Sequence, residues 1–488
     1  MANVFNLNQF KKEPVVLVKK EVKSGITLTE HQSLIYDTLL PFSMGALSYK
    51  MLLLEGYAGT GKSTIVNHLI AALLSDTGKV IGVTAPTNKA VKVLRKMSKY
   101  LPTFSERLQY KTIHSLLGLK EVIGNDGKKR YVADKLTKKS IDQIDFLILD
   151  EASMLQDELF EEIQLYVMGG LRVLFVGDGK QIPPVMQDEA TPFNEENRRI
   201  LKIEHLVLSE IVRQAAGNPI IQMATAIREH PTYRKSFLSF LPEDPVTDSG
   251  DGVYPVHDMD FFVRVCNKLY LSAAYKTDSD YVKIVCWTNR EVDKLNNYIR
   301  TLLYPEQCSD RIVIGERLLA EETIIDRTEG LERLQYTTND EFEVLSYTIS
   351  HVVIVGVNYK IYNCVVASSG EERENIRVLH EDSQEDYDKV LARFKELAVN
   401  DRSGKAAPLW ANFYNFQTNF AKIKYNYAIT AHKSQGSTYT NCIVLVDDVC
   451  KNSYLIERNK ILYTAITRAS RRLFMVEIPI SFSRKNLR

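Results

Sequence analysis

The chain reads Gly56-Tyr57-Ala58-Gly59-Thr60-Gly61-Lys62-Ser63 between an apolar run and a helix-compatible segment. This octapeptide, called the phosphate loop below, matches G-x-x-x-x-G-K-[ST] at every fixed position. Its glycines let backbone N–H groups turn inward around phosphate oxygens, and the following helix offers its N-terminus to the same anion. Lys62 is expected to reach the terminal phosphates of a bound nucleotide, and Ser63 to ligate Mg²⁺. A glycine turn without nucleotide is the alternative, which the strand–loop–helix setting disfavours.

Short apolar runs alternate with helix-compatible sequence on both sides of the phosphate loop. Expected strands are residues 51–54, 80–84, 146–149 and 173–176, and expected helices are residues 29–40 and 88–97. A second region begins near Leu208, with expected strands at residues 281–287, 425–430, 442–446 and 473–478 and a helix at residues 291–302. Such alternation is typical of parallel sheets covered on both faces. The sequence therefore predicts an α/β fold with two parallel-sheet domains, of which the second is discontinuous.

Three segments interrupt this alternation. Residues 119–142 place Gly124-Asn125-Asp126-Gly127 between two short β-prone runs, and such turn residues predict a hairpin outside the first sheet. Residues 310–380 are rich in Val, Ile, Tyr and Thr and predict a small β-rich insertion. A helix is expected at residues 381–399, and residues 401–424 look aromatic and irregular. The first 25 residues are expected to form a loose arm, to which we assign no role.

The composition of the chain excludes some classes of protein but leaves its function open. The 488 residues carry a net charge of only +1, which argues against a basic protein that coats duplex DNA. A locally basic channel is still compatible with this charge. Six cysteines without C-x-x-C spacing disfavour a zinc site or disulfide framework and predict a reduced, cytoplasmic protein. We expect no membrane span and no secretory signal, because apolar runs of the required length are missing.

Two acids follow the apolar run at residues 146–149. Asp150 is expected to hold Mg²⁺, directly or through water, and Glu151 to orient or deprotonate an attacking water. Acids at a helix N-terminus are the alternative explanation. The phosphate loop upstream favours the catalytic interpretation.

Further polar groups follow the run at residues 173–176. Asp178 and Gln181 are expected at the carboxyl edge of the sheet, where α/β proteins bind ligands, although a polar turn is the alternative. Gln181 could contact both phosphate and the attacking water through its amide. Arg213 and Arg468 are candidates for the cations that phosphoryl transfer needs from across an interface. For either arginine alone, a surface salt bridge is the commoner explanation.

A last polar segment reads Thr430-Ala431-His432-Lys433-Ser434-Gln435-Gly436 and follows an apolar run. It offers hydroxyl, imidazole and amide groups without the spacing of a metal site. Contacts to the phosphates of a nucleic-acid backbone are one use for such groups. A helix N-cap at Thr430 is the alternative.

The ordered set of motifs resembles the superfamily 1 helicases, and within them the RecD-like branch that moves 5′ to 3′. The motifs are GYAGTGKS, TAPTNKA, TIHSLLG, LDEAS, GDGKQIPPV, LSEIVRQ, ITAHKSQG and YTAITRA. They extend, with Leu28-Thr29-Glu30-His31-Gln32 ahead of the phosphate loop, from residue 28 to about residue 470, which covers nearly the whole chain. This resemblance implies two RecA-like domains with ATP bound in the cleft between them.

The resemblance also implies an order of domains. The first RecA-like domain would comprise residues 26–118 and 143–208, with a strand-separating hairpin, the pin, at residues 119–142. The second would comprise residues 209–309 and 425–488, with an SH3-like and tower insertion at residues 310–424. Residues 1–25 would be the arm.

Individual site residues are carried over on the matching motifs. Gln32 would read adenine, Tyr57 would neighbour the phosphates, and the other expected nucleotide contacts are Gly56, Ala58, Gly59, Thr60, Gly61, Lys62, Ser63, Thr64, Asp178 and Gly436. The expected DNA contacts are Pro86, Thr87, Asn88, Thr112, His114, Thr430, His432 and Lys433. Tyr131 is our candidate for the wedge, since an aromatic ring can stack on a splayed base. A polar, solvated hairpin is the open alternative.

The expected function is an ATP- and Mg²⁺-dependent DNA helicase that acts in replication, recombination or repair. It would move along single-stranded DNA, unwind forked duplex DNA, work as a monomer and meet a single-strand-binding or other replication protein. Two alternatives remain at this point: a translocase that displaces proteins without unwinding, and an accessory that binds a partner protein with ATP as a switch. An RNA substrate also remains open, because backbone contacts discriminate poorly without 2′-hydroxyl recognition.

Overall fold

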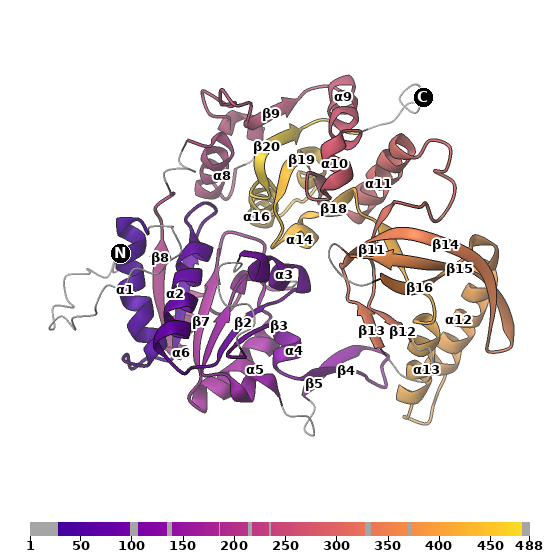
Figure 1. The fold of residues 1–488 in the computed structure, drawn as a ribbon, viewed down its shortest axis with the longest axis horizontal. Coiled ribbons are helices and arrows are strands. Elements are labelled where there is room, and N and C mark those ends of the chain that lie inside the picture. Colours follow the sequence, from indigo (N-terminus) through magenta and orange to yellow (C-terminus); the bar gives the residue numbers. More distant parts are fainter. Residues whose placement is uncertain are drawn as a thin grey trace.

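The computed structural model describes residues 28–97, 106–133, 139–184, 186–212, 217–233, 236–326, 333–368 and 373–480. The expected arm at residues 1–25 lies outside them. Figure 1 shows two α/β domains side by side, with a third, mostly β part next to both. Within the described ranges, each helix is too short or too polar to cross a membrane.

The first domain, called domain 1, is built on a six-stranded parallel sheet in the order β3-β2-β6-β7-β1-β8. In chain order, its strands are β1 (Met51–Gly56), β2 (Ile81–Ala85), β3 (Leu108–Thr112), β6 (Phe146–Leu149), β7 (Arg172–Gly177) and β8 (Ile203–Leu208). Its helices are α1 (Glu30–Met44), α2 (Lys62–Asp76), α3 (Asn88–Met97), α4 (Ile113–Leu116), α5 (Asp157–Met168) and α6 (Glu195–Leu201), with 3-10 turns η2 (Ser140–Gln143) and η3 (Ala152–Met154).

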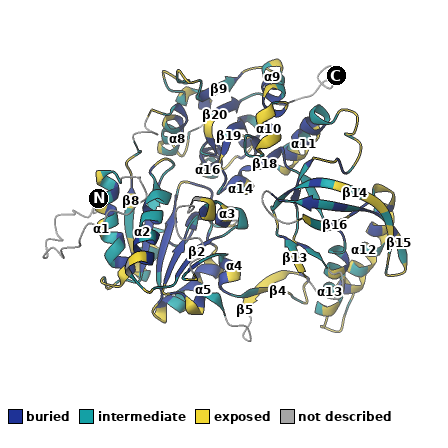
Figure 2. Ribbon diagram, in the orientation of Figure 1, coloured by how far each residue is buried: buried dark blue, intermediate teal, exposed yellow. Residues whose placement is uncertain are grey.

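Both faces of this sheet are covered, which explains its continuous apolar strands. Strands β2 and β6 are buried along their whole length. One face packs against α1 and α2 through residues such as Leu39 and Leu69. The other face packs against α5 through residues such as Phe160 and Ile163. Figure 2 shows the strands dark blue between more exposed helices.

The second domain, called domain 2, has a five-stranded parallel sheet in the order β18-β10-β19-β20-β9. Its strands are β9 (Gly252–Val256), β10 (Val282–Cys286), β18 (Ala428–Thr430), β19 (Tyr439–Leu445) and β20 (Ala469–Val476). Its helices are α8 (Pro219–Glu229), α9 (Met259–Tyr270), α10 (Ala273–Thr277), α11 (Asn289–Leu303), α14 (Ala431–Ser434), α15 (Val446–Val449) and α16 (Leu455–Ile466), with the 3-10 turn η4 (Phe237–Phe240). Strands from both sides of the insertion build one sheet, so the predicted discontinuity is confirmed.

The predicted hairpin forms between β4 (Leu119–Ile123) and β5 (Lys129–Ala133). The two strands are antiparallel, with Glu121 opposite Tyr131. They belong to neither large sheet and extend toward the β-rich part of the molecule (Figure 1).

The β-rich part, called the β module, has a second five-stranded sheet in the order β16-β15-β14-β11-β17. Its strands are β11 (Arg317–Ala320), β14 (Glu341–Ile354), β15 (Val357–Ala367), β16 (Arg373–Leu379) and β17 (Ile423–Tyr425), and β12 (Ile324–Asp326) pairs separately with β13 (Arg333–Tyr336). It also holds η6 (Glu381–Ser383), α12 (Gln384–Val399) and α13 (Ala407–Gln417).

Two expectations for this region were wrong. Residues 401–424 were expected to be irregular, but α13 forms there with a proline in its first turn, where a missing N–H costs nothing. Its Phe416 stacks on Tyr387 of α12 with ring centres 5.2 Å apart. The single strand expected at residues 425–430 is two strands, because β17 pairs with β11 while β18 pairs with β10.

Candidate functional site

The phosphate loop links the end of β1 to the start of α2. Gly59 and Gly61 both have φ near +81°, a conformation that side chains with a Cβ rarely adopt. A Cβ on Gly61 would also lie 2.3 Å from Nε2 of Gln32. The hydroxyl of Thr60 donates to the carbonyl of Tyr57 at 2.9 Å and tightens the turn. The glycines are therefore required by the path of the backbone.

Gln32 holds the phosphate loop against α1. Its Nε2 donates to the carbonyl of Thr60 at 3.0 Å, and its Oε1 accepts from the N–H of Thr29 at 3.0 Å. The side chain is only 4% exposed, so these bonds are made away from water. This places Gln32 beside the loop, where the resemblance expects it, and its contact with adenine stays a prediction.

Lys62 begins α2 and points back into the phosphate loop. Its ammonium donates to the carbonyls of Gly56 and Tyr57, the second at 3.1 Å. Ser63 and Thr64 follow in the first helical turn, where the N–H of Thr64 donates to the carbonyl of Gly61 at 3.0 Å. The ammonium therefore already lies where it can transfer from loop carbonyls to an incoming phosphate.

Asp150 and Glu151 follow β6, at the same edge of the sheet. Burial raises the pKa of Asp150 to about 7, the charge of Glu151 adds to this rise, and Lys62 opposes it. The N–H of Glu151 donates to Oδ1 of Asp150 at 2.9 Å. Glu151 itself has φ near +52°, which is uncommon for a residue with a side chain and typical of functional sites.

These residues fit a nucleotide with Mg²⁺. Mg²⁺ is usually bound by one or two carboxylates together with phosphate oxygens and water, so a large acidic cluster is not required. Among the described residues, no group of three or more His, Cys, Asp and Glu side chains is placed to hold a metal ion by itself. Asp150 would supply the carboxylate and Ser63, in the first turn of α2, a hydroxyl, and a dication would offset the buried negative charge. Bound Mg²⁺ would neutralise charge on the phosphates.

The segment that follows the carboxyl end of β7 forms hydrogen bonds with domain 2. Asp178 is fully buried and accepts from the hydroxyl of Tyr463 at 2.6 Å and from the N–H of Lys180 at 3.0 Å. Gln181 accepts from Nη2 of Arg468 at 3.3 Å. Tyr463 lies on α16 and Arg468 two residues beyond its end. The polar turn at 177–184 is thus also a contact with the other domain.

Arg468 does not form a surface salt bridge. It is 6% exposed, and its Nε donates to the carbonyl of Thr464 at 3.0 Å. The main chain around Ile182 adds to this interface, since its N–H donates to Thr464 and its carbonyl accepts from Gln435. The salt-bridge alternative for Arg468 is therefore wrong.

Arg213, the other expected arginine, lies outside the described residues. Its neighbour Val212 donates its N–H to the carbonyl of Gly59 at 3.1 Å. Gly436 of domain 2 also approaches the site: it has φ near +70°, and a Cβ there would lie 3.9 Å from Oε1 of Glu151. Several expected nucleotide residues are thus brought together from both domains.

Two residues at this interface were missed by sequence reasoning. Tyr463 begins the motif YTAITRA, but the motif alone does not reveal the contacts of its hydroxyl. Arg228 of α8 lies outside all of the motifs given above, and its guanidinium lies 3.6 Å from the ring centre of Tyr57. A contact between residues so far apart in sequence leaves no local pattern.

The expected DNA residues of domain 1 lie on α3, α4 and the segments before them. Pro86 separates β2 from α3, and Thr87 accepts from the N–H of Ala90 at 3.2 Å. Thr112 caps α4 by accepting from the N–H of Ser115. Asn88 donates to the hydroxyl of Thr337 in the β module at 2.7 Å.

His114 and Tyr131 bring α4 and the hairpin together. Their ring centres are 4.4 Å apart. Burial lowers the pKa of His114 from its usual value, so the ring is neutral at pH 7. Tyr131 is 55% exposed, which leaves its ring accessible to a base. The wedge role stays a prediction.

In domain 2, Thr430 is a helix cap, as the alternative proposed, because its hydroxyl accepts from the N–H of Lys433 at 3.3 Å. His432 and Lys433 lie in the short helix α14, which begins directly after this cap. Burial lowers the pKa of His432, and burial together with nearby Lys424 lowers that of Lys433. Their contacts with DNA stay predictions.

The tip of the hairpin is bound to the β module. Asn125 donates to the carbonyl of Gly404 at 2.9 Å and accepts from the N–H of Ala407 at 3.0 Å. The hydroxyl of Tyr414 donates to the carbonyl of Gly127 at 2.8 Å. These bonds hold the tip of the hairpin against α13 and the segment that leads into it (Figure 1).

A second bridge connects α3 to the β module. Lys89 pairs with Glu341 at 3.0 Å, and Lys92 pairs with Asp340 at 3.2 Å. Burial alone would raise the pKa of Glu341, but Lys283 and Lys89 lower it to about 2. The pair is therefore ionised at neutral pH.

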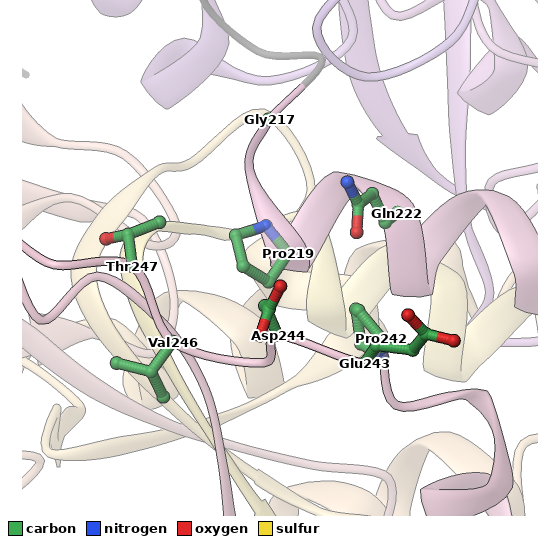
Figure 3. A pocket seen from close by; sticks show the side chains of 8 residues that line it. All are labelled: Gly217, Pro219, Gln222, Pro242, Glu243, Asp244, Val246 and Thr247. Carbon is green, nitrogen blue, oxygen red and sulfur yellow. The ribbon is translucent and has the colours of Figure 1, made fainter.

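A separate pocket of about 440 Å³ lies at the start of α8 (Figure 3). Residues from 217–222 and 242–247 line it, including the carboxylates Glu243 and Asp244. None of the expected nucleotide or DNA residues is among them, so this pocket is not part of the candidate site.

Two family models match the chain. Residues 43–239 match an AAA domain, and residues 425–476 match the UvrD-like helicase C-terminal domain. The chain is 28% identical over 452 residues to the ATP-dependent DNA helicase dda of Enterobacteria phage T4, covering 87% of this chain and 93% of that protein. It is 25% identical over 462 residues to the ATP-dependent RecD2 DNA helicase of Deinococcus radiodurans, covering 94% of this chain and 50% of that protein. Among solved structures, the Pif1 helicase from Candida albicans is 15% identical, with a TM-score of 0.46 and coverage of 95% of this chain and 98% of that chain.

Proposed function

We propose that the chain is a superfamily 1 helicase of the RecD and Pif1 type, similar to Dda, which uses ATP to move 5′ to 3′ along single-stranded DNA and to unwind duplex DNA. Its two parallel-sheet domains are RecA-like, and ATP is hydrolysed at the edge where they meet. Single-stranded and forked DNA are the proposed substrates, and Mg²⁺ the proposed cofactor.

One observation carries this proposal: the phosphate loop of domain 1 and Arg468 of domain 2 belong to one connected polar site. Lys62, Asp150 and Glu151 supply the groups for nucleotide, metal and water on one side. Arg468 reaches Gln181 on the same sheet edge from the other side. Phosphoryl transfer is accelerated by a cation supplied across an interface, so movement of the domains and turnover of ATP are linked.

The DNA path is proposed along the segments that flank this site. The segment 86–88, the cap of α4 and the cap of α14 each follow a sheet strand and present hydroxyl or amide groups. Such groups contact phosphates and position a strand without reading its sequence. Closure of the cleft would shift the contacts of one domain relative to the other, which advances the strand.

We propose that the hairpin separates the strands, with Tyr131 as its exposed ring. Its anchorage to α13 supports this role, because a wedge that yields cannot split base pairs. The proposal further places a monomeric protein in the cytoplasm, in the host if the chain is phage-encoded, together with a single-strand-binding or other replication protein. All six cysteines are free, in keeping with a reducing compartment.

The test is unwinding of two duplexes that carry either a 5′ or a 3′ single-stranded tail, with ATP and Mg²⁺. We expect strand separation from the 5′-tailed duplex only. Lys62→Ala should abolish it while leaving much of the single-strand binding. Unwinding of the 3′-tailed duplex alone would refute the polarity. ATP turnover stimulated by DNA without unwinding of either duplex would instead identify a translocase that displaces proteins.

A further inference from the structure

The phosphate loop is held by domain 2 at two adjacent residues. Tyr57 and Ala58 occupy positions that the motif G-x-x-x-x-G-K-[ST] leaves free. The guanidinium of Arg228 lies 3.6 Å from the ring centre of Tyr57, and the N–H of Ala58 donates to the hydroxyl of Tyr463 at 3.5 Å. Domain 2 therefore contacts the loop itself as well as the sheet edge beside it.

Tyr463 connects three parts of the site through one hydroxyl. It is 2% exposed, and while it accepts from Ala58 it donates to Oδ2 of Asp178 at 2.6 Å. Burial and the charge of Asp178 raise the pKa of Tyr463 well above its usual value, so the hydroxyl keeps its proton and stays a donor. The loop, the end of β7 and α16 are thereby joined.

Arg228 makes the second connection from the last turn of α8. Its side chain is 13% exposed, so the contact with the Tyr57 ring is shielded from water. A planar guanidinium stacks on an aromatic face in a way that an ammonium cannot reproduce. Helices α8 and α16 pack in the same apolar cluster, through Met223 and Leu462 among others, so both contacts move with one rigid part of domain 2.

We propose that Tyr463 and Arg228 are positioning residues that make the geometry of the phosphate loop depend on the placement of domain 2. This inference rests on the proposed function, because it concerns ATP turnover at this loop. Arg468 follows the same helix as Tyr463, so one movement of α16 sets both the loop and the arginine that faces Gln181. DNA that changes the position of domain 2 relative to domain 1 would then change the rate of ATP turnover by altering the phosphate loop.

The first test is Tyr463→Phe, which removes one hydroxyl and keeps the buried ring. The readout is the ratio of ATP turnover with and without single-stranded DNA, because loss of folded protein lowers both rates equally and leaves the ratio unchanged. We expect the ratio to fall about tenfold, with a smaller change in KM for ATP than in kcat. A ratio within about twofold of the unmodified protein would overturn the role of Tyr463, on the scale at which a lost hydrogen bond is felt.

Tyr270→Phe is the matched control. Tyr270 is also fully buried in domain 2, and its hydroxyl donates one bond, to the carbonyl of Tyr427 at 2.7 Å. It lies in the other apolar cluster of that domain, away from α8 and α16. The control should keep the stimulation ratio. A fall equal to that of Tyr463→Phe would show that any lost buried hydroxyl in domain 2 has the effect, and would overturn the inference.

The second test is a double-mutant cycle with Tyr57→Ala and Arg228→Met, read as kcat/KM for ATP. If the stacked pair acts as a unit, each substitution should lower kcat/KM by a factor at least about threefold smaller in the presence of the other substitution than in the unmodified protein. Arg228→Lys keeps the charge and should restore little. Additive effects would overturn the role of Arg228. If instead the unmodified protein shows no DNA-stimulated turnover, the proposed function itself fails, which is a separate result.

Discussion

The guanidinium of Arg468 donates to the side-chain oxygen of Gln181 at 3.3 Å, across the boundary between the two parallel-sheet domains. Both side chains are at most 6% exposed, so this contact is made in a site that excludes water. An arginine in such a place is worth more to a charged transition state than one on the surface, because the local dielectric is low.

Arg468→Ala should therefore reduce catalysis more than binding. We expect kcat for ATP to fall about 10³-fold, the lower range for a lost arginine that acts across an interface, with nucleotide affinity changed far less. Steady-state turnover and equilibrium nucleotide binding measure the two effects. Arg471→Ala is the matched control, since Arg471 lies three residues further on and makes an exposed pair with Asp251. Equal losses in both variants would contradict the assigned role.

Gly61→Ala should disable nucleotide binding. The new Cβ would meet Nε2 of Gln32 at 2.3 Å, and φ near +81° is strained for alanine. Because Gln32 also holds Thr60, relief of the clash would displace the loop from α1. Gly78→Ala serves as the control, since no described heavy atom lies within 4 Å of its added Cβ. Nucleotide affinity measured by titration should fall at least about tenfold in the first variant only, the scale of a strained backbone site.

Glu341→Gln should destabilise the junction of α3 with the β module in a pH-dependent manner. The folded pKa of Glu341 is lowered to about 2 from a usual value of 4.5. Its ionised form therefore adds stability above about pH 4.5, and this contribution is lost as pH falls through about 2. At pH 7 we expect a loss on the order of 2 kcal/mol, seen as a lower thermal midpoint.

The same thermal melts should show a constant difference between Glu341→Gln and the unmodified protein above about pH 5, and a shrinking difference as the pH is lowered from about 4.5 toward 3. Glu385→Gln is the control, because the pair that Glu385 makes with Lys389 on α12 is exposed to solvent. A difference that is constant with pH would show that Glu341 acts through shape and not through its charge.

The hairpin should matter for unwinding and not for ATP turnover. The combined variant Asn125→Ala and Tyr414→Phe removes three hydrogen bonds that join the hairpin tip to α13 and to the segment that leads into it. We expect unwinding of a 5′-tailed duplex to fall at least about fivefold, the effect of about 1 kcal/mol, with DNA-stimulated ATP turnover retained. Tyr454→Phe, an exposed tyrosine at the start of α16, is the control. A parallel loss of turnover would contradict a purely mechanical role for the hairpin.

Sequence predicted the parts of this molecule whose chemistry is local. The phosphate loop needs glycines where φ is positive, so its conformation is visible in Gly59 and Gly61. The run Gly124-Asn125-Asp126-Gly127 likewise specifies a tight turn, and β4 and β5 form around it. Buried parallel strands such as β2 and β6 are continuous apolar runs, which made both sheets recognisable.

The failures involve contacts that only the folded chain creates. Helix α13 was not expected because its aromatic residues do not recur with a clear helical spacing. Tertiary packing stabilises this helix, as in the stacking of Phe416 on Tyr387. The split of residues 425–430 between two sheets depends on the choice of partner strand. Tyr463 and Arg228 meet the phosphate loop from far along the chain, and no local spacing encodes that meeting.

We infer that ATP turnover and DNA binding act on one cleft between the two domains. This coupling is measured as the rate of ATP hydrolysis by the unmodified protein with Mg²⁺, first without DNA and then with saturating single-stranded DNA. We expect a clear rise in kcat on addition of DNA, and the loss of this rise in Lys62→Ala. Equal turnover with and without DNA would contradict it.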